Sequence, residues 1–227
     1  MLSSPKHITI IVGHYGSGKT EFAVNFAFFL ADLGKRVSLV DLDIVNPYFC
    51  SREREEQLSQ KDIALIAQSV ACRSADVPAL PPQVSRMFSD NAGCYIVDVG
   101  GDDVGARVLS RYQPQFKTSN YDLWLVVNAN RPQTGSPTQA LEYLHRIERT
   151  SRLKVSGIVN NTHLCNRTTL DDVRRGNALA VRLCRMTDLP LICHVASSAI
   201  LSTDDNTTGI EGTLFPIDIR MKKPWEL

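Results

Sequence analysis

The sequence predicts an α/β protein, a single three-layer domain spanning residues 1–227 in which helices cover both faces of a mainly parallel sheet. Three observations support this fold class. Short apolar runs alternate with helical patterns along the whole chain, which is typical of βαβ units. A glycine-rich turn joins the first apolar run to the first helical pattern. Carboxylate or amide side chains follow several later apolar runs, as they do at the ligand-binding edge of open α/β sheets.

Length and composition are consistent with one globular domain. The chain has 227 residues, 43% of them hydrophobic, and a formal net charge of +1, so it can bury a sizeable core. The near-neutral charge disfavours a general nucleic-acid-binding protein. Neither a membrane-spanning apolar stretch nor a signal-peptide core is visible, and the six cysteines lack C-x-x-C spacing. We therefore expect a cytoplasmic protein with free thiols and no stable membrane insertion.

The first strand is expected at Ile8 to Val12 and the first helix from Lys19 to about Leu33. Between them lies a full match to the phosphate-binding pattern G-x-x-x-x-G-K-[ST], formed by Gly13, His14, Tyr15, Gly16, Ser17, Gly18, Lys19 and Thr20. Its glycines let backbone N–H groups approach phosphate oxygens, and the helix N-terminus adds partial positive charge. Lys19 would contact the β- and γ-phosphates, and the Thr20 hydroxyl would bind Mg²⁺. The alternative, a strand-to-helix turn without a ligand, is disfavoured by the complete match.

A pair of acidic residues follows the second expected strand, at 37–40. Asp41 and Asp43 are two residues apart, which puts their side chains on one side of an extended segment. A ligand site at the end of a parallel strand is one interpretation, and capping of the next turn is the other. Before the next buried strand we expect three minor elements: a surface helix at 51–58, a strand at 63–66 and a loop at 70–92 that includes a short helix near 83–88.

A buried strand at 94–97 leads into Asp98 and then Val99-Gly100-Gly101. An apolar strand ending in Asp, distant in sequence from a phosphate loop, is the Walker B arrangement, in which the carboxylate holds Mg²⁺. The spacing from Asp98 to Gly101 lets a backbone N–H approach the γ-phosphate. Alone this signal is weak, but a complete phosphate loop in the same chain makes it fairly specific.

The second half of the chain continues the alternation. We expect strands at 123–127, 155–159 and 191–195 and capping boxes at Ser136 to Gln139 and Thr168 to Asp171. The strand at 155–159 is followed by Asn160 and Asn161. From the local pattern alone, turn residues are an equally good interpretation of these two amides.

The phosphate loop, the Asp-x-Asp pair and the Asp98 region together resemble the MinD/ParA and CobB/CobQ group of P-loop NTPases over most of the chain. The resemblance implies ATP and Mg²⁺ as cofactors. It implies a catalytic role for Lys19, and for Asp43 in positioning the attacking water, with Thr20, Asp43 and Asp98 around the metal. Asn160, with Asn161 as the alternative, matches the strand end where this group recognises the adenine base.

One position departs from the group's pattern K-G-G-x-x-K-[ST]. Its first lysine reaches across an ATP-sandwiched dimer, and His14, followed by Tyr15, stands there in this chain. A histidine is a part-time cation near neutral pH, so the resemblance implies a homodimer as one assembly but leaves dimer-dependent activation open. The guanine motif N-K-x-D is missing at 160–163, which favours ATP over GTP.

The leading hypothesis is a Mg²⁺-dependent, slow ATPase that acts as a nucleotide switch on an unidentified protein partner. Turnover is expected to be slow because no arginine finger is identifiable in the chain. One alternative is an ATP-dependent kinase or ligase of a small-molecule acceptor, with segment 70–92 and the loop after Asp103 forming the acceptor pocket. The other is a non-catalytic, nucleotide-controlled binding module whose partner surface is Asn46 to Leu58.

Overall fold

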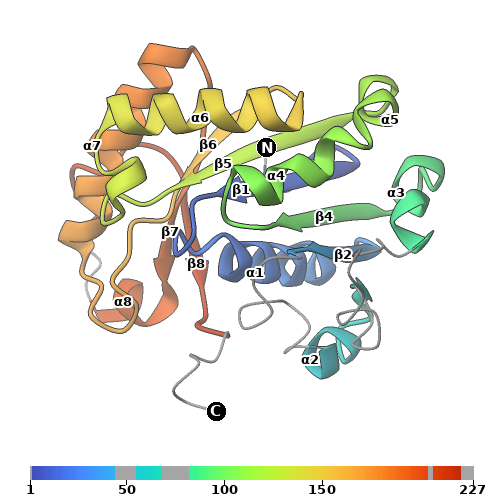
Figure 1. The fold of residues 1–227 in the computed structure, drawn as a ribbon. Coiled ribbons are helices and arrows are strands. Elements are labelled where there is room, and N and C mark those ends of the chain that lie inside the picture. Colours follow the sequence, from blue (N-terminus) through green and yellow to red (C-terminus); the bar gives the residue numbers. More distant parts are fainter. Residues whose placement is uncertain (1, 44–54, 68–81, 204–206, 221–227) are drawn as a thin grey trace.

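The computed structural model describes residues 2–43, 55–67, 82–203 and 207–220. Within these ranges one sheet has the strand order β3-β2-β4-β1-β5-β6-β7-β8, and every neighbouring pair is parallel (Figure 1). The strands are β1 (Ile8–Gly13), β2 (Val37–Leu42), β3 (Ala64–Ile66), β4 (Cys94–Val99), β5 (Tyr121–Val127), β6 (Gly157–Asn160), β7 (Leu191–Ser197) and β8 (Leu214–Ile217). The helices are α1 (Lys19–Asp32), α2 (Glu55–Ser59), α3 (Arg86–Ser89), α4 (Asp103–Ser110), α5 (Gln113–Thr118), α6 (Pro137–Ser151), α7 (Leu170–Thr187) and α8 (Ser198–Thr203), with 3-10 turns η3 (Pro82–Ser85) and η4 (Pro132–Thr134).

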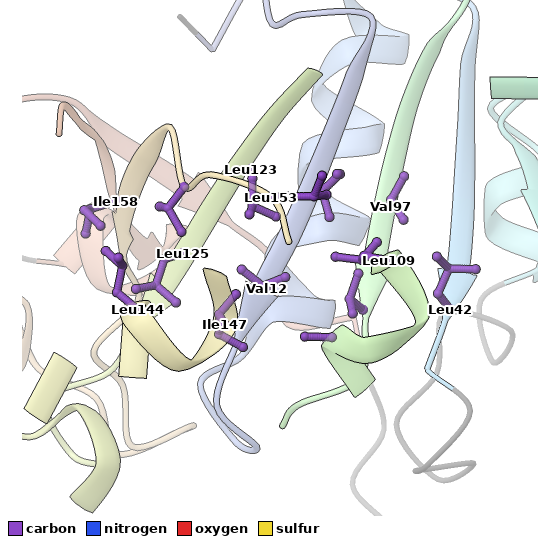
Figure 2. Close-up of a cluster of buried hydrophobic side chains, with 14 of the residues drawn as sticks. Val12, Leu42, Val97, Leu109, Leu123, Leu125, Leu144, Ile147, Leu153 and Ile158 are labelled. Atoms are coloured by element: carbon purple, nitrogen blue, oxygen red, sulfur yellow. The ribbon is translucent and has the colours of Figure 1, made fainter. Parts of the chain in front are cut away.

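Helices cover both faces of the sheet, so the central strands are buried on both sides. Along β5, Leu123 and Leu125 join one hydrophobic cluster, and Trp124 joins the other, as the alternation of side chains along a strand requires. Figure 2 shows the first cluster, in which Leu109 of α4 and Leu144 of α6 face the sheet. Helix α1 lies on the opposite face. The predicted three-layer α/β fold is confirmed.

An aromatic cluster holds α1 on the sheet. Phe22 and Phe26, one turn apart on the buried face of α1, stack at 5.7 Å between ring centroids. Phe26 also lies 5.2 Å from Trp124 of β5, and Phe215 of β8 packs edge-on to Phe22 at 5.6 Å. Gly34, in a left-handed conformation with φ 75°, ends the helix region through a hydrogen bond from its N–H to the Ala31 carbonyl. The phosphate loop is thus attached to a firmly packed helix.

The position of β1 determines where a ligand can bind. β1 lies between β4 and β5, and the chain leaves β1 toward β2 on one side, whereas later strands extend the sheet on the other side. Such a reversal of strand order opens a crevice at the carboxyl ends of the strands. The loop after Gly13 lies at this point, so the topology places the phosphate-binding motif at the sheet's natural ligand edge.

Several elements differ from the sequence predictions. Strands β2 and β4 continue through Asp41 and Asp98, which therefore belong to the strands rather than follow them. The chain after Asp102 forms helix α4, not the expected loop, because the Asp102 side chain caps it by accepting from the Gly105 N–H at 2.6 Å. Strand β8 was not predicted. Its Pro216 disfavours an interior strand, but β8 is an edge strand, where proline is tolerated.

One predicted cap is confirmed and one is shifted. The Ser136 hydroxyl caps α6 by accepting from the Gln139 N–H at 3.3 Å. The box of α7 is formed by Thr169 and Asp172, one residue later than the expected pair that starts at Thr168. The Thr168 hydroxyl instead donates to the Cys165 carbonyl at 2.6 Å, in the turn that precedes the helix.

Two expected functional segments lie mainly outside the described residues. These are the expected partner surface Asn46 to Leu58, of which only α2 is described, and the proline-bearing part of 70–92 before residue 82. Among the helices of the described ranges, none has the length and apolar character that crossing a bilayer requires.

Phe26→Ala is expected to lower the free energy of unfolding by about 3–5 kcal/mol, because it leaves a cavity among four aromatic neighbours. Urea denaturation measures this loss. Phe29→Ala is the control, since Phe29 is on the same helix but only partly buried, and its loss should be smaller. Equal losses for the two variants would contradict the importance assigned to the aromatic cluster.

Candidate functional site

The loop of residues 13–18 forms a compact turn at the amino end of α1. Gly16 and Gly18 have φ of 73° and 79°, a left-handed conformation that strains residues with a side chain. The Ser17 N–H donates across the loop to the His14 carbonyl at 2.9 Å, and the Gly18 carbonyl accepts the first helical bond from Phe22 at 2.9 Å. The loop therefore has the tight backbone and the free helix N-terminus that phosphate binding requires.

Lys19 and Thr20 lie inside the site rather than on the surface. Their exposed fractions are 6% and 7%. Lys19 influences Asp98 electrostatically, and its Nζ lies 3.0 Å from the position that a Cβ at Gly101 would occupy. Burying an ammonium group is costly without compensating charge, and the carboxylates at the ends of β2 and β4 supply that charge.

Three carboxylates gather beside Lys19. Asp41 of β2 and Asp98 of β4 are register partners in adjacent strands. The Asp41 carboxylate accepts from the Asp43 N–H at 3.0 Å, which fixes the turn after β2. All three side chains are buried. The structure thus brings Lys19, Thr20, Asp43 and Asp98 together, as the sequence predicted from separate motifs.

Asp98 is buried in an environment that disfavours its charge. Desolvation raises the pKa of Asp98 to about 7, with a smaller contribution from Asp41 and against the lowering effect of Lys19 and of the Thr20 hydroxyl. Neither carboxylate oxygen of Asp98 meets hydrogen-bond geometry with any residue of the described chain. A buried carboxylate without full compensation, next to a threonine hydroxyl, is the donor set that suits Mg²⁺.

The segment after β4 packs against the phosphate loop. A Cβ at Gly101 would lie 2.8 Å from Cα of Tyr15, so only glycine allows this approach. A Cβ at Gly100 would lie 3.1 Å from an Asp43 carboxylate oxygen. Gly101 therefore packs directly on the phosphate loop, and the Asp43 carboxylate lies against the neighbouring Gly100.

The two asparagines after β6 have different environments. Asn160 is fully buried, and its amide group donates to the Val173 carbonyl at 3.3 Å and contacts His194 at 2.9 Å, while its oxygen accepts from Thr162. Asn161 donates instead to the Ser17 carbonyl at 2.9 Å, within the phosphate loop. The role of either residue in base recognition stays a prediction, and Asn160 presents no exposed atom for it.

His14 and Tyr15 lie at the outer side of the loop. The His14 Nδ1 is 2.8 Å from the Tyr15 carbonyl, and its ring meets the Tyr143 ring edge-on at 5.8 Å. The Tyr143 hydroxyl donates to the Gly101 carbonyl at 3.4 Å. Tyr15 itself is 51% exposed. Tyr143 thus connects the phosphate loop to the segment after β4, a role for which its place on the apolar face of α6 gave no signal.

Sequence reasoning also missed Arg131 and His163. The Arg131 Nε donates to the Gly16 carbonyl at 2.9 Å, so an arginine does lie against the phosphate loop. His163 accepts at Nδ1 from the Cys165 N–H at 3.2 Å, which leaves the proton on Nε2, beside Gly18. Burial lowers the pKa of His163 to about 4, with the nearby Arg131 charge contributing. His163 is therefore neutral at physiological pH.

Asp98→Asn is expected to stabilise the ligand-free protein at pH 8 by up to about 4 kcal/mol. A carboxyl group whose pKa rises from 3.8 to about 7 on folding destabilises the fold progressively as pH rises through this interval, and fully above it. The gain should therefore shrink as pH falls toward 4. Urea denaturation at pH 5 and pH 8 measures it, with the exposed Asp171→Asn as control. A variant less stable than the parent at pH 8 would contradict the burial cost assigned to Asp98.

Comparisons with known proteins identify the family and the fold. A family model described as the CobQ/CobB/MinD/ParA nucleotide binding domain matches residues 8–185. A search among curated proteins gives no match.

Solved structures of low sequence identity share the fold. The chain is similar to the cell division protein FtsY of Thermotoga maritima, with a TM-score of 0.59 and 19% identity, covering 83% of this chain and 60% of that one. The chain is also similar to chloroplast FtsY from Physcomitrella patens, with a TM-score of 0.56 and 16% identity, covering 83% of this chain and 57% of that one. A third similar structure is the signal recognition particle 54 kDa protein from Aeropyrum pernix K1 in complex with GDP. Its TM-score is 0.54 at 21% identity, covering 83% of this chain and 41% of that one.

These likenesses show the fold alone, and this chain spans about 60% of the length of the first FtsY structures. The family match is more informative, because it covers most of the chain and includes the phosphate loop, Asp43 and Asp98. The chain belongs to the CobQ/CobB/MinD/ParA family of P-loop nucleotide-binding domains.

Proposed function

We propose that this protein is a Mg²⁺-dependent, slow ATPase that works as a nucleotide switch. The observation that carries the proposal is the gathering of buried Lys19, Thr20 and Asp98 at the amino end of α1, with Gly101 packed on the phosphate loop and Asp43 beside Gly100. Phosphoryl transfer needs positioning and charge neutralisation more than covalent chemistry, and these groups supply both.

Lys19 neutralises the β- and γ-phosphates, and the loop N–H groups with the α1 N-terminus hold the same oxygens. The Thr20 hydroxyl and the Asp98 carboxylate would hold Mg²⁺, directly or through water. The ion supplies charge neutralisation between the β- and γ-phosphates when bound. A cation next to Asp98 would favour the ionised form of its carboxyl group and so lower its pKa when the nucleotide binds with Mg²⁺.

Asp43 orients the attacking water. Its carboxylate lies beside Gly100, next to the Gly101 that packs on the loop, and its backbone is fixed by the N–H bond to Asp41. Gly101 offers a backbone N–H to the γ-phosphate. Loss of that phosphate would release the segment after β4, and this release is the switching step in the proposal.

ATP is the proposed nucleotide, because residues 160–163 lack the Lys and Asp of the guanine motif. One similar structure holds GDP, so affinity for both purine nucleotides is the relevant measurement. The alternative of a small-molecule kinase or ligase loses one half of its expected acceptor pocket, since the chain after Asp102 forms α4. Phosphate release in the absence of any acceptor favours the ATPase.

Lys19→Ala is expected to weaken binding of Mg²⁺-ATP by more than about 30-fold, because truncating a buried charged partner costs roughly 2–5 kcal/mol. Isothermal titration calorimetry with Mg²⁺-ATP and Mg²⁺-GTP measures the loss and also ranks the two nucleotides. Lys117→Ala is the matched control, since Lys117 is exposed on α5 near the amino ends of the strands. If the Lys19 variant binds the nucleotide as tightly as the parent, Lys19 does not contact the phosphates.

Asp43→Ala is expected to bind ATP normally and to lose hydrolysis by about 100-fold, the scale of a lost proton-transfer or water-positioning group. Release of inorganic phosphate measures this loss, with the exposed Asp32→Ala as control. Unchanged hydrolysis would show that Asp43 does not orient the water.

The Asp43 variant also tests assembly, because it holds ATP without turning it over. Sizing chromatography with and without ATP should show an ATP-dependent homodimer if the protein switches partners as the family does. A monomer under both conditions would contradict that assembly and favour the small-molecule enzyme.

A further inference from the structure

Three consecutive carbonyl groups of the phosphate loop are held by side chains from other parts of the sheet edge. The Arg131 Nε donates to the Gly16 carbonyl at 2.9 Å. The Asn161 amide donates to the Ser17 carbonyl at 2.9 Å and to the Gly18 carbonyl at 3.2 Å. Arg131 and Asn161, which we call the P-loop clamp, follow β5 and β6, so two strand ends restrain the loop.

The geometry of the peptide unit determines how the clamp orients the N–H groups of the loop. A planar trans peptide directs its carbonyl and the following N–H in opposite directions. Holding the carbonyls of residues 16, 17 and 18 therefore directs the N–H groups of Ser17, Gly18 and Lys19 away from the two clamp side chains. The Ser17 N–H accordingly faces the His14 carbonyl across the loop. The N–H groups of residues 17–19 are the ones that would surround a phosphate.

Arg131 is itself held in place by its surroundings. Its N–H donates to the Asn128 carbonyl at 3.0 Å, and the Thr134 hydroxyl donates to the same carbonyl at 2.8 Å. Asn128 and Thr134 are fully buried. Asn130 donates to the His163 carbonyl at 3.1 Å, which joins the segment after β5 to the segment after β6. Arg131 therefore projects from a rigid turn rather than from a free loop.

The fit between Arg131 and the loop is close. A Cβ at Gly16 would lie 2.7 Å from the guanidinium carbon, so the arginine occupies the space that glycine leaves open. The guanidinium also adds a permanent positive charge beside the loop. His163, which lies beside Gly18, is neutral and adds none.

We propose that Arg131 is a positioning residue that, together with Asn161, holds the phosphate loop in its anion-binding shape before the nucleotide arrives. The proposal rests on the proposed nucleotide-binding function of the loop. Because the clamp acts on the backbone that surrounds the β-phosphate, it stabilises bound di- and triphosphates equally. A guanidinium that touched the γ-phosphate would instead favour the triphosphate alone.

The test compares Arg131→Met with Arg131→Lys and with Arg182→Met, a control at an exposed arginine of α7. Fluorescence titration with nucleoside di-, tri- and monophosphates, each with Mg²⁺, measures the affinities. Arg131→Met is expected to weaken di- and triphosphate binding by about tenfold each, the scale of a lost charged hydrogen bond. Monophosphate binding should change little. Arg131→Lys should recover part of the affinity, and Arg182→Met should leave all of it.

Two further measurements separate positioning from general stability. Hydrogen exchange of peptides covering residues 13–20 should be faster in ligand-free Arg131→Met, while its melting temperature stays within a few degrees of the parent. Loss of triphosphate affinity alone would overturn the proposal in favour of direct phosphate contact. Unchanged affinities with unchanged exchange would also overturn it. If the parent itself binds no nucleotide, the proposed function fails, and hydrogen exchange still decides whether Arg131 orders the loop.

Discussion

The burial of Lys19 among carboxylates is the constraint on which this site depends. An ammonium group that is 6% exposed needs negative charge close by, and β2 and β4 provide it with Asp41 and Asp98 as register partners. Desolvation raises the pKa of Asp98, and the neighbouring Asp41 and Asp43 carboxylates add to the rise against the lowering effect of Lys19. The site is therefore electrostatically incomplete by itself, which a bound divalent cation would correct.

The parallel pairing of the strands brings these residues together at one edge of the sheet. Residues 13, 41, 98 and 161 are far apart in the sequence, but each lies at the carboxyl end of β1, β2, β4 or β6. Because the strands are parallel and β1 is central, all of these ends meet at one edge. The aromatic cluster between α1 and β5 then fixes the direction of the α1 N-terminus relative to this edge. Fold stability and ligand geometry thus depend on the same packing.

Motifs with fixed local spacing could be predicted from the sequence, and contacts between distant segments could not. The phosphate loop, the Asp-x-Asp pair and the Asp98 strand each carry their chemistry in a few consecutive residues. Arg131 follows a strand in an ordinary turn sequence, and only the adjacency of β1 and β5 brings it to Gly16. Tyr143 has the same sequence pattern as any core residue of α6. Strand β8 was missed because Pro216 is compatible with a strand only at an edge.

The clamp acts on the same loop as residue 14, the position where this chain departs from the family pattern. The resemblance places a lysine at residue 14 that acts across a dimer, and this chain has His14, whose Nδ1 is engaged with the Tyr15 carbonyl. Arg131 provides a permanent charge at the same loop from within the chain, and it does so through a rigid turn. A loop restrained in this way loses less conformational freedom when it binds phosphate. Nucleotide affinity in this protein would then depend on its own β5 and β6 ends, whether or not a second subunit is present.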